Sequence, residues 1–431
     1  MSRAILLSAF NFALAGSGVA QGCAVPLALG TVTVLPGPCP SGPGPLPNTT
    51  CYLVQVACAG LDPIVAQVRV TEPPAGALPR GTVVLGTGGG GTGFYTATSG
   101  GLPLLQSVNG LGYRVVERAW AAQNGWIGGG PGGLRAKSCR YASLLTWIHG
   151  SFHSGGAFCA TGNSGGSAEI GYALTTWGRG DILDLAVPTS GPPLGRLDYT
   201  CPFPPTPEWA ALCPSIVPPV AMQCVPACSF APVPNGNSVC LTCTGNPTLA
   251  DLRADSVSHL DAALAYPDTR THWIFGALDC GVSVPAGLAW ANAVSSEKVL
   301  EFVPDTPHAI FSTPGGREAV RRAIATLPRI LASGNPSPGG TLSMNAFGPP
   351  GESALLFLGA TPASYAIPGL YGTVGIADPV FVGAGTIGAN ETFVWTFPLD
   401  PSLSCCIGAT VRFQALLLPN VTNVEVVTLL P

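Results

Sequence analysis

Apolar and polar positions follow two different periods between residues 51 and 331. Runs that are apolar throughout, or apolar at every second residue, predict β-strands; they lie at residues 51–58, 64–70, 81–85, 113–120, 157–161, 181–187, 271–279 and 298–303. Segments with apolar residues at helical spacing lie between them, at residues 134–148, 169–174, 249–265, 285–294 and 315–331. Strands that alternate with helices predict an α/β domain with a mainly parallel sheet.

The pattern changes twice. Residues 195–245 interrupt the alternation with six cysteines among many prolines, which indicates an insertion. After a Ser-, Pro- and Gly-rich stretch at residues 333–340, four short apolar runs are separated by Gly, Pro and Asn turns and predict strands; they lie at residues 354–358, 392–397, 409–417 and 424–430. We therefore expect a first domain over residues 21–334 and a small all-β accessory domain over residues 335–431.

The N-terminal residues and the number of cysteines indicate the cellular compartment in which the protein works. Arg3 precedes a short apolar run, and Gly18-Val19-Ala20 offers small residues before Gln21, so residues 1–20 are expected to be a signal peptide. Fifteen cysteines fit an oxidising compartment, and their odd number leaves at least one thiol free or paired between chains. We expect an extracellular or periplasmic protein whose mature chain begins with disulfides among Cys23, Cys39, Cys51 and Cys58.

The charge and the hydropathy of the chain limit the classes of partner that it is expected to bind. Only 9% of the residues are charged, the formal net charge is -4, and no basic patch occurs, which argues against nucleic acid as a partner. The mean hydropathy of +0.40 is high. It comes from alanine, glycine and valine, and beyond the N-terminus no run approaches the roughly 18 apolar residues of a spanning helix.

One motif carries a chemical proposal. The apolar run that starts at Ala157 leads into Gly162-Asn163-Ser164-Gly165-Gly166 and then into a helical segment, in the order strand, sharp turn, helix. Glycines on both sides of Ser164 permit the close backbone approach that such a turn requires. This segment resembles the nucleophile elbow of the α/β-hydrolase superfamily. The resemblance covers about residues 50–330 and implies an α/β-hydrolase fold with a Cys-rich cap at residues 195–245.

A serine nucleophile needs a base, and the base needs an orienting acid. In the order of the superfamily, the base is a histidine after the last strand. Of five histidines only His308 stands there, after the strand at 298–303; the others are His149, His153, His259 and His272. The acid is expected at the end of the preceding strand, which points to Asp279, with Asp305 as the alternative.

The resemblance also implies an oxyanion hole. Its first donor is the N–H of Gly165, and its second comes from the Gly-rich loop after residue 85, from Gly89 or Gly90. The same loop suggests an alternative, because Gly86, Gly88 and Gly91, with Glu117 toward the end of the next strand, match a loose dinucleotide-binding pattern. The export signal and the two strands that precede the loop argue against that alternative.

The sequence thus predicts a secreted serine hydrolase that cleaves a carboxylic ester through an acyl-enzyme, with no metal or organic cofactor. The substrate is a small-molecule or polymeric ester, and the C-terminal domain offers attachment to a surface or polymer. Two alternatives remain: a peptidase or amidase on the same fold, and a non-catalytic secreted binding or adhesion protein. In the insertion, Cys224-x3-Cys228 and Cys240-x2-Cys243 could bind zinc, but disulfides are expected there.

Overall fold

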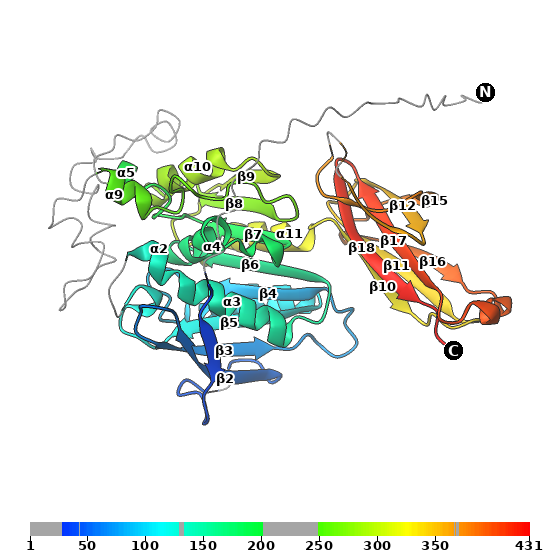
Figure 1. Ribbon diagram of the computed structural model, residues 1–431, viewed down its shortest axis with the longest axis horizontal. Coiled ribbons are helices and arrows are strands. Elements are labelled where there is room, and N and C mark those ends of the chain that lie inside the picture. Colours follow the sequence, from blue (N-terminus) through cyan, green and yellow to red (C-terminus); the bar gives the residue numbers. More distant parts are fainter. Residues whose placement is uncertain (1–27, 43, 129–132, 201–248, 366, 368–369) are drawn as a thin grey trace.

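The computed structural model describes residues 28–42, 44–128, 133–200, 249–365, 367 and 370–431. The expected signal peptide and nearly all of the Cys-rich insertion therefore lie outside the described residues. The described chain forms two domains, one built on a large sheet with helices on both faces and one made of strands (Figure 1).

The large sheet has nine strands in the order β1-β2-β3-β5-β4-β6-β7-β8-β9. Its strands are β1 Thr31–Val34, β2 Thr49–Ala57, β3 Ile64–Thr71, β4 Gly81–Gly86, β5 Tyr113–Trp120, β6 Ala157–Asn163, β7 Leu185–Thr189, β8 Arg270–Gly276 and β9 Lys298–Val303. The pairs β1–β2, β2–β3 and β3–β5 are antiparallel, and every pair from β5 to β9 is parallel. From β2 onward this order, with an antiparallel second strand, is that of the α/β-hydrolase fold.

Strand alternation divides the core of this domain into two clusters, one on each face of the sheet. In β4, Val83 and Leu85 face one cluster and Val84 faces the other, as the two-residue period of a strand requires. Helices α3, α4 and α10 contribute to the first cluster, and α1 and α11 to the second. The helices are α1 Gly101–Gly110, α2 Leu134–Lys137, α3 Cys139–Phe152, α4 Gly165–Thr175, α5 Leu197–Thr200, α9 Leu249–Ala254, α10 Ser283–Ala293 and α11 Pro314–Ala325.

Two disulfides join the N-terminal part of this domain. Cys39 pairs with Cys51, within the segment where disulfides were expected. Cys58 pairs with Cys139 at the start of α3, and this long-range bridge differs from the local pairing predicted for Cys58. The reason is packing, because α3 lies against β1 and β2, so the end of β2 meets the first turn of α3. Cys23 lies outside the described residues.

The C-terminal domain is a sandwich of a three-stranded sheet, β10-β11-β16, and a four-stranded sheet, β15-β12-β17-β18, with a short β13–β14 pair. Its strands are β10 Arg329–Gly334, β11 Thr341–Phe347, β12 Ser353–Gly359, β13 Pro362–Tyr365, β14 Val374–Ile376, β15 Val380–Thr386, β16 Thr392–Pro398, β17 Thr410–Leu417 and β18 Asn420–Thr428. Inward side chains such as Met344 and Trp395 from one sheet and Leu356 and Leu417 from the other share one core.

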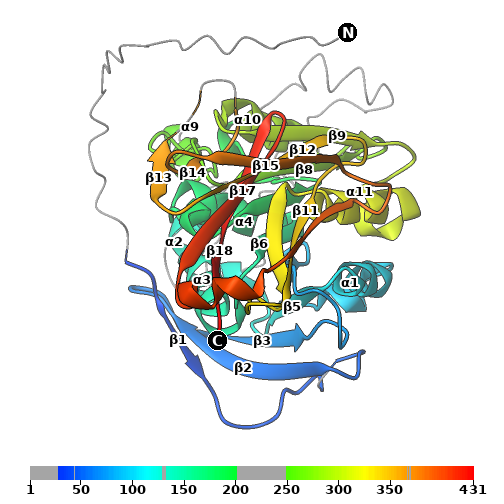
Figure 2. The same ribbon diagram turned by 90° about the vertical axis from the view of Figure 1, so that its right-hand side faces the viewer.

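The junction between the domains differs from the sequence-based boundary. The last helix of the first domain, α11, ends at Ala325, whereas a helix was expected to continue to residue 331. Residues 329–334 instead form β10, which pairs antiparallel with β11 of the sandwich. Figure 2 shows the sandwich in front of the first domain. No helix within the described ranges is long and apolar enough to cross a membrane.

Candidate active site

Ser164 occupies the turn between β6 and α4, in a backbone conformation that side chains rarely adopt. Its φ is 54° and its ψ is -112°, and its N–H donates to the Thr189 carbonyl at 2.9 Å. A methyl group on Gly162 would lie 2.6 Å from the backbone of Gly166, so the turn is too tight for side chains at its flanks. The sequence therefore produces the strained elbow that the motif predicts.

Asp279 and His308 meet at the carboxyl end of the same sheet. Asp279 follows β8 and is buried, with 2% of its side chain exposed; His308 follows β9 and is 44% exposed. His308 Nδ1 lies 2.9 Å from Asp279 Oδ2, and Gly281 N–H donates to the other carboxylate oxygen at 3.1 Å. Asp305, the alternative acid, is exposed and has a φ of 52°. The structure thus pairs His308 with Asp279.

The loop that carries His308 is attached to the elbow through Asn163. The side-chain oxygen of Asn163 accepts from Ile310 N–H at 3.3 Å and from Thr189 Oγ1 at 3.1 Å. Asn163, next to Ser164, is therefore joined directly to Ile310, two residues after His308. Among the described residues, no hydrogen bond links Ser164 Oγ to the His308 ring. The acid and the base are in contact, and the serine lies at the same carboxyl edge of the sheet, directly after β6.

The Gly-rich loop after β4 packs against the elbow. A methyl group on Gly165 would lie 1.9 Å from the Gly89 carbonyl oxygen, and one on Gly88 would lie 3.3 Å from Ser164 Cβ. Gly90 faces elsewhere, since its carbonyl accepts from Trp126 N–H at 3.1 Å. Gly165 is the first residue of α4, where backbone N–H groups have no partner within the helix. Gly88 and Gly89 therefore lie against the elbow; Gly88 belongs to the predicted loop but was not one of the two glycines predicted as the donor.

A buried ion pair, which the sequence analysis missed, connects this loop to the elbow helix. Arg118 of β5 and Glu169 of α4 are ion-paired with fully buried side chains, and Trp120 Nε1 donates to Glu169 Oε1 at 2.8 Å. Arg118 also donates to the carbonyls of Gly91 at 3.1 Å and Thr87 at 3.4 Å. Burial lowers the pKa of Arg118 to about 10, so the guanidinium stays charged near neutral pH.

The sequence contains a feature that indicates a buried ion pair: charged residues within apolar segments of a chain that has few charges. Charged residues are only 9% of the chain, yet Glu169 stands in an otherwise apolar helical segment and Arg118 in a strand flanked by parallel and antiparallel neighbours. A charge on a buried element must be paired, because an unpaired one is too costly. The partner could not be assigned from sequence, since the two residues approach each other only across the sheet.

The dinucleotide alternative requires a helix that starts within the Gly-rich loop. The structure instead continues from the loop into a short 3-10 turn at Tyr95–Ala97, and the next α-helix, α1, starts at Gly101. Glu117, which would have bound a ribose, is fully buried, and its Oε1 accepts from Thr96 N–H at 2.7 Å. Burial raises the pKa of Glu117. The Glu117 side chain therefore holds the backbone at Thr96, and because it is buried it is not accessible to a nucleotide.

Nearly all of the predicted cap, including its Cys-rich part, lies outside the described residues. Helices α5 and α9, which flank that part, pack against each other, and Ser256 Oγ accepts from Leu197 N–H at 2.9 Å. Cys280, next to Asp279, is disulfide-bonded. Within the described chain, no cluster of three or more His, Cys, Asp or Glu side chains is arranged to hold a metal ion.

No family model matches the chain, and no curated protein matches it. Solved structures to which it is similar include Est1E from Butyrivibrio proteoclasticus, at 13% identity and a TM-score of 0.40, covering 63% of this chain and 95% of that one. Acetyl xylan esterase 1 from Thermoanaerobacterium has 14% identity and a TM-score of 0.38, covering 68% and 87%. Dienelactone hydrolase from Anabaena variabilis has 13% identity and a TM-score of 0.36, covering 64% and 94%.

The classification of the fold rests on this chain's own features. From β2 to β9 the strand order and directions are those of the α/β-hydrolase fold, and the strained turn at Ser164 stands between a central strand and the helix after it. The first domain of this protein accordingly has the α/β-hydrolase fold.

Proposed function

We propose that the protein is a serine hydrolase that cleaves carboxylic esters through an acyl-enzyme. The observation that carries this proposal is the His308–Asp279 hydrogen bond of 2.9 Å, made at the edge of the sheet that also carries the strained serine of the elbow. A serine hydroxyl is a poor nucleophile until a base removes its proton, and an imidazole does so best when a carboxylate fixes its orientation. These are the groups that this edge of the sheet provides.

Ser164 is the nucleophile of the proposed reaction, and His308 moves the protons. With Nδ1 engaged by Asp279, the His308 ring presents Nε2 to Ser164 Oγ and removes its proton as the hydroxyl attacks the ester carbonyl. The imidazolium then gives the proton to the departing alkoxide, which leaves an acyl group on Ser164. In the second half, His308 deprotonates a water molecule that attacks the acyl-enzyme, and the proton returns to Ser164 as the acid departs.

The tetrahedral intermediates carry a negative oxygen that needs donors. Gly165 N–H at the first turn of α4 is one donor, and the helix dipole adds to its effect. The second donor comes from the Gly88–Gly89–Gly90 stretch, of which Gly88 and Gly89 lie nearest the elbow. The buried Arg118–Glu169 pair holds both ends of this stretch through the Thr87 and Gly91 carbonyls, so it positions the donors without contacting the substrate.

The alternatives differ in what they require of this site. A peptidase or amidase uses the same three residues but must protonate a poorer leaving group, so only substrate assays separate it from an esterase. A binding or adhesion protein has no use for a base oriented by a buried acid. Attachment to a surface or polymer through the C-terminal sandwich remains part of the proposal, as does export, which the disulfides Cys39–Cys51 and Cys58–Cys139 support.

A fluorophosphonate probe tests the proposal directly, because it reacts covalently with an activated serine. We expect labelling of Ser164, mapped by peptide mass, and turnover of short p-nitrophenyl esters. Labelling and turnover should both disappear in S164A and be retained in the matched control S151A, which removes an exposed serine at the end of α3. A folded protein that is neither labelled nor active would reject the assignment, whereas faster cleavage of p-nitroanilides than of esters would favour the amidase.

A further inference from the structure

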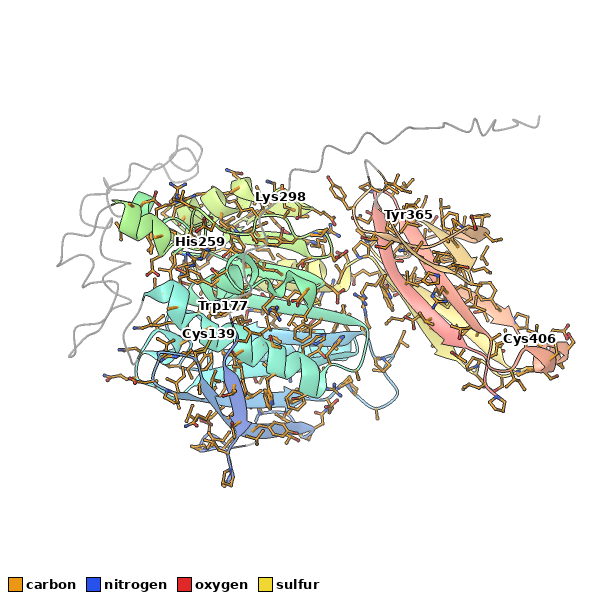
Figure 3. The ribbon with its side chains drawn as sticks, in the orientation of Figure 1. Cys139, Trp177, His259, Lys298, Tyr365 and Cys406 are labelled. Atoms are coloured by element: carbon orange, nitrogen blue, oxygen red, sulfur yellow. A yellow bond between two sulfur atoms is a disulfide. The ribbon has the colours of Figure 1, made fainter. Side chains whose placement is uncertain are left out.

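Two adjacent cysteines lie at the end of the C-terminal sandwich that is remote from Ser164. Cys405 and Cys406 close a short 3-10 helix, Pro401–Cys406, which connects β16 to β17. Figure 3 shows Cys406 at the tip of the sandwich, away from the first domain. Cys405 is exposed and Cys406 partly so. Both thiols are therefore accessible to small molecules in solution.

The two sulfur atoms are closer than adjacent residues of a helix usually allow. Their Sγ atoms are 3.3 Å apart, whereas side chains at neighbouring helical positions normally diverge. Cys405 Sγ also donates to the Ser402 carbonyl at 3.5 Å, and the chain leaves the helix in an extended conformation at Ile407. The local fold thus brings two thiols into contact, with no other element packed between them.

The other described cysteines are either paired in disulfides or buried. Cys39 with Cys51 and Cys58 with Cys139 are already disulfides, and such bonds persist in oxidising surroundings. Cys159 is the third free cysteine of the described chain, but it is fully buried in β6, and burial raises its pKa. Among the described free cysteines, only Cys405 and Cys406 combine access with a partner thiol.

We propose that Cys405 and Cys406 form a redox site that a small-molecule disulfide of the glutathione class oxidises to a vicinal disulfide. The exposed Cys405 thiolate attacks one sulfur of the small disulfide, forms a mixed disulfide and releases one small thiol. The Cys406 thiolate then attacks the Cys405 sulfur and releases the second small thiol. In total the two cysteines lose two protons and two electrons, and the small disulfide is reduced to two thiols.

Closure within the chain is favoured over pairing with a second copy of it. A thiol held 3.3 Å away acts at an effective concentration far above that of a thiol on another molecule. A ring closed by adjacent residues departs from relaxed disulfide geometry, and strained, exposed disulfides are the more easily reduced ones. The pair should therefore open and close under conditions that leave Cys39–Cys51 and Cys58–Cys139 intact.

Peptide mass spectrometry can measure the oxidation state of Cys405 and Cys406 separately from that of the other cysteines. No Lys or Arg lies between Arg329 and Arg412, so trypsin releases residues 330–412 as one peptide, whose only cysteines are Cys405 and Cys406. The full-length protein is treated with a mild reductant, equilibrated with oxidised glutathione, alkylated with iodoacetamide and digested without reduction. We expect a peptide lighter by two hydrogen atoms and free of alkyl groups. Two alkylated cysteines, two glutathione adducts or a peptide cross-linked to its copy would overturn the proposal.

Single-cysteine variants provide the controls. In C406S the resolving thiol is missing, so the reaction should stop with one glutathione on Cys405, while C159A should behave like the parent protein. A titration with increasing reductant should restore alkylation at Cys405 and Cys406 before it does so at Cys51 or Cys139. If all these cysteines became alkylated at the same reductant concentration, the pair would not be a separately responsive redox site and the proposal would fail.

Discussion

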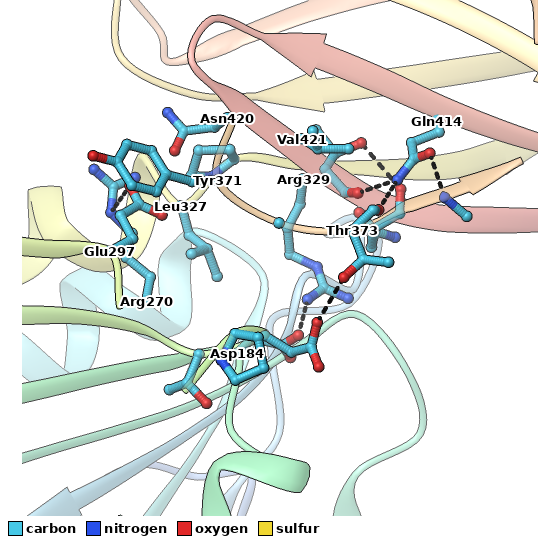
Figure 4. A pocket seen from close by; sticks show the side chains of 18 of the residues that line it. Asp184, Arg270, Glu297, Leu327, Arg329, Tyr371, Thr373, Gln414, Asn420 and Val421 are labelled. Carbon is cyan, nitrogen blue, oxygen red and sulfur yellow. Dashed lines mark hydrogen bonds and ion pairs between the residues drawn. The ribbon is translucent and has the colours of Figure 1, made fainter. Parts of the chain in front are cut away.

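The two ends of the same parallel strands carry polar groups of different character. At the carboxyl ends of β6, β8 and β9 are Ser164, Asp279 and His308. At or just before the amino ends of β7, β8 and β9 are Asp184, Arg270 and Glu297, which line a hollow between the two domains (Figure 4). One sheet thus presents a candidate reaction site at one end and a domain contact at the other.

At the amino end, charges are paired with each other. Arg329 of β10 lies 2.6 Å from Asp184, and Arg270 lies 3.2 Å from Glu297. Thr373 Oγ1 of the sandwich donates to Asp268 at 3.2 Å. Burial raises the pKa of Glu297, and the nearby Arg270 opposes that rise. These groups satisfy one another, so the contact joins the domains and leaves little for chemistry.

At the carboxyl end, Asp279 and His308 are paired with each other, but the serine is not paired with the histidine. Ser164 is held with a positive φ and makes no hydrogen bond to His308, whose side chain remains 44% exposed. A strained serine that is not paired with the histidine at one end, with charges paired across a domain contact at the other, is what distinguishes the candidate site from a structural contact. The comparison predicts that substitutions at the two ends will separate activity from stability.

The largest effect on activity, after loss of the serine, is expected from D279N. An asparagine can still bond His308 Nδ1 but favours the wrong tautomer, so kcat on a p-nitrophenyl ester should fall by about 10⁴-fold. The melting temperature should change little. D305N is the matched control, because Asp305 is exposed and lies on the same loop as His308. A loss of activity in D305N comparable to that in D279N would mean that the acid is wrongly assigned.

The second prediction concerns the buried pair behind the Gly-rich loop. E169Q leaves Arg118 without its charged partner, which should cost about 3–5 kcal/mol in the free energy of unfolding. Replacing both residues, as R118M/E169M, removes the uncompensated charge and should recover most of that loss, measured by denaturant titration. Activity should not recover, because the Thr87 and Gly91 carbonyls lose the guanidinium that holds the loop.

We expect the folded double variant to keep its KM while kcat falls by roughly 10²-fold, the effect of losing one oxyanion donor. A merely structural role for the pair would restore kcat together with stability. That outcome would contradict a positioning role for Arg118.

The residues in these two predictions differ in whether their partners could be predicted from the sequence. The elbow, the strand at residues 113–120 and the contact of His308 with Asp279 could be predicted, because each depends on local spacing or on order along the chain. The Arg118–Glu169 pair and the Cys58–Cys139 bridge could not, because their partners meet only after the sheet and helices have packed. The domain junction was predicted from the Ser- and Pro-rich stretch at residues 333–340. The residues of β10 lie before that stretch or at its start and were therefore assigned to the first domain, whereas β10 pairs with β11 of the sandwich.

The third prediction tests the amino end. R329A removes the ion pair with Asp184 and a hydrogen bond of 2.7 Å to the Gly156 carbonyl. We expect a loss of about 1–3 kcal/mol in unfolding free energy and unchanged kcat and KM. R412A is the matched control, since Arg412 bonds the Ala360 carbonyl within the sandwich and spans no domain contact. A fall in kcat for R329A alone would mean that the domain contact acts on the site.

The smallest effect is a pH dependence at the amino end. His153 closes α3 near Thr82, and burial, followed by the neighbouring His149, lowers its pKa from the ordinary 6.5 to about 4. As the pH falls from 6.5 to about 4, the unfolded chain takes up a proton that the folded one refuses, so stability present above pH 6.5 is progressively lost. H153N removes that group and should flatten the curve of unfolding free energy against pH in this window. Part of the slope should remain, because burial also lowers the pKa of His259 to about 4, and H153N/H259N should flatten the curve further. A curve for H153N that is parallel to that of the parent protein between pH 6.5 and 4 would show that His153 titrates normally and that this end of the sheet is open to solvent.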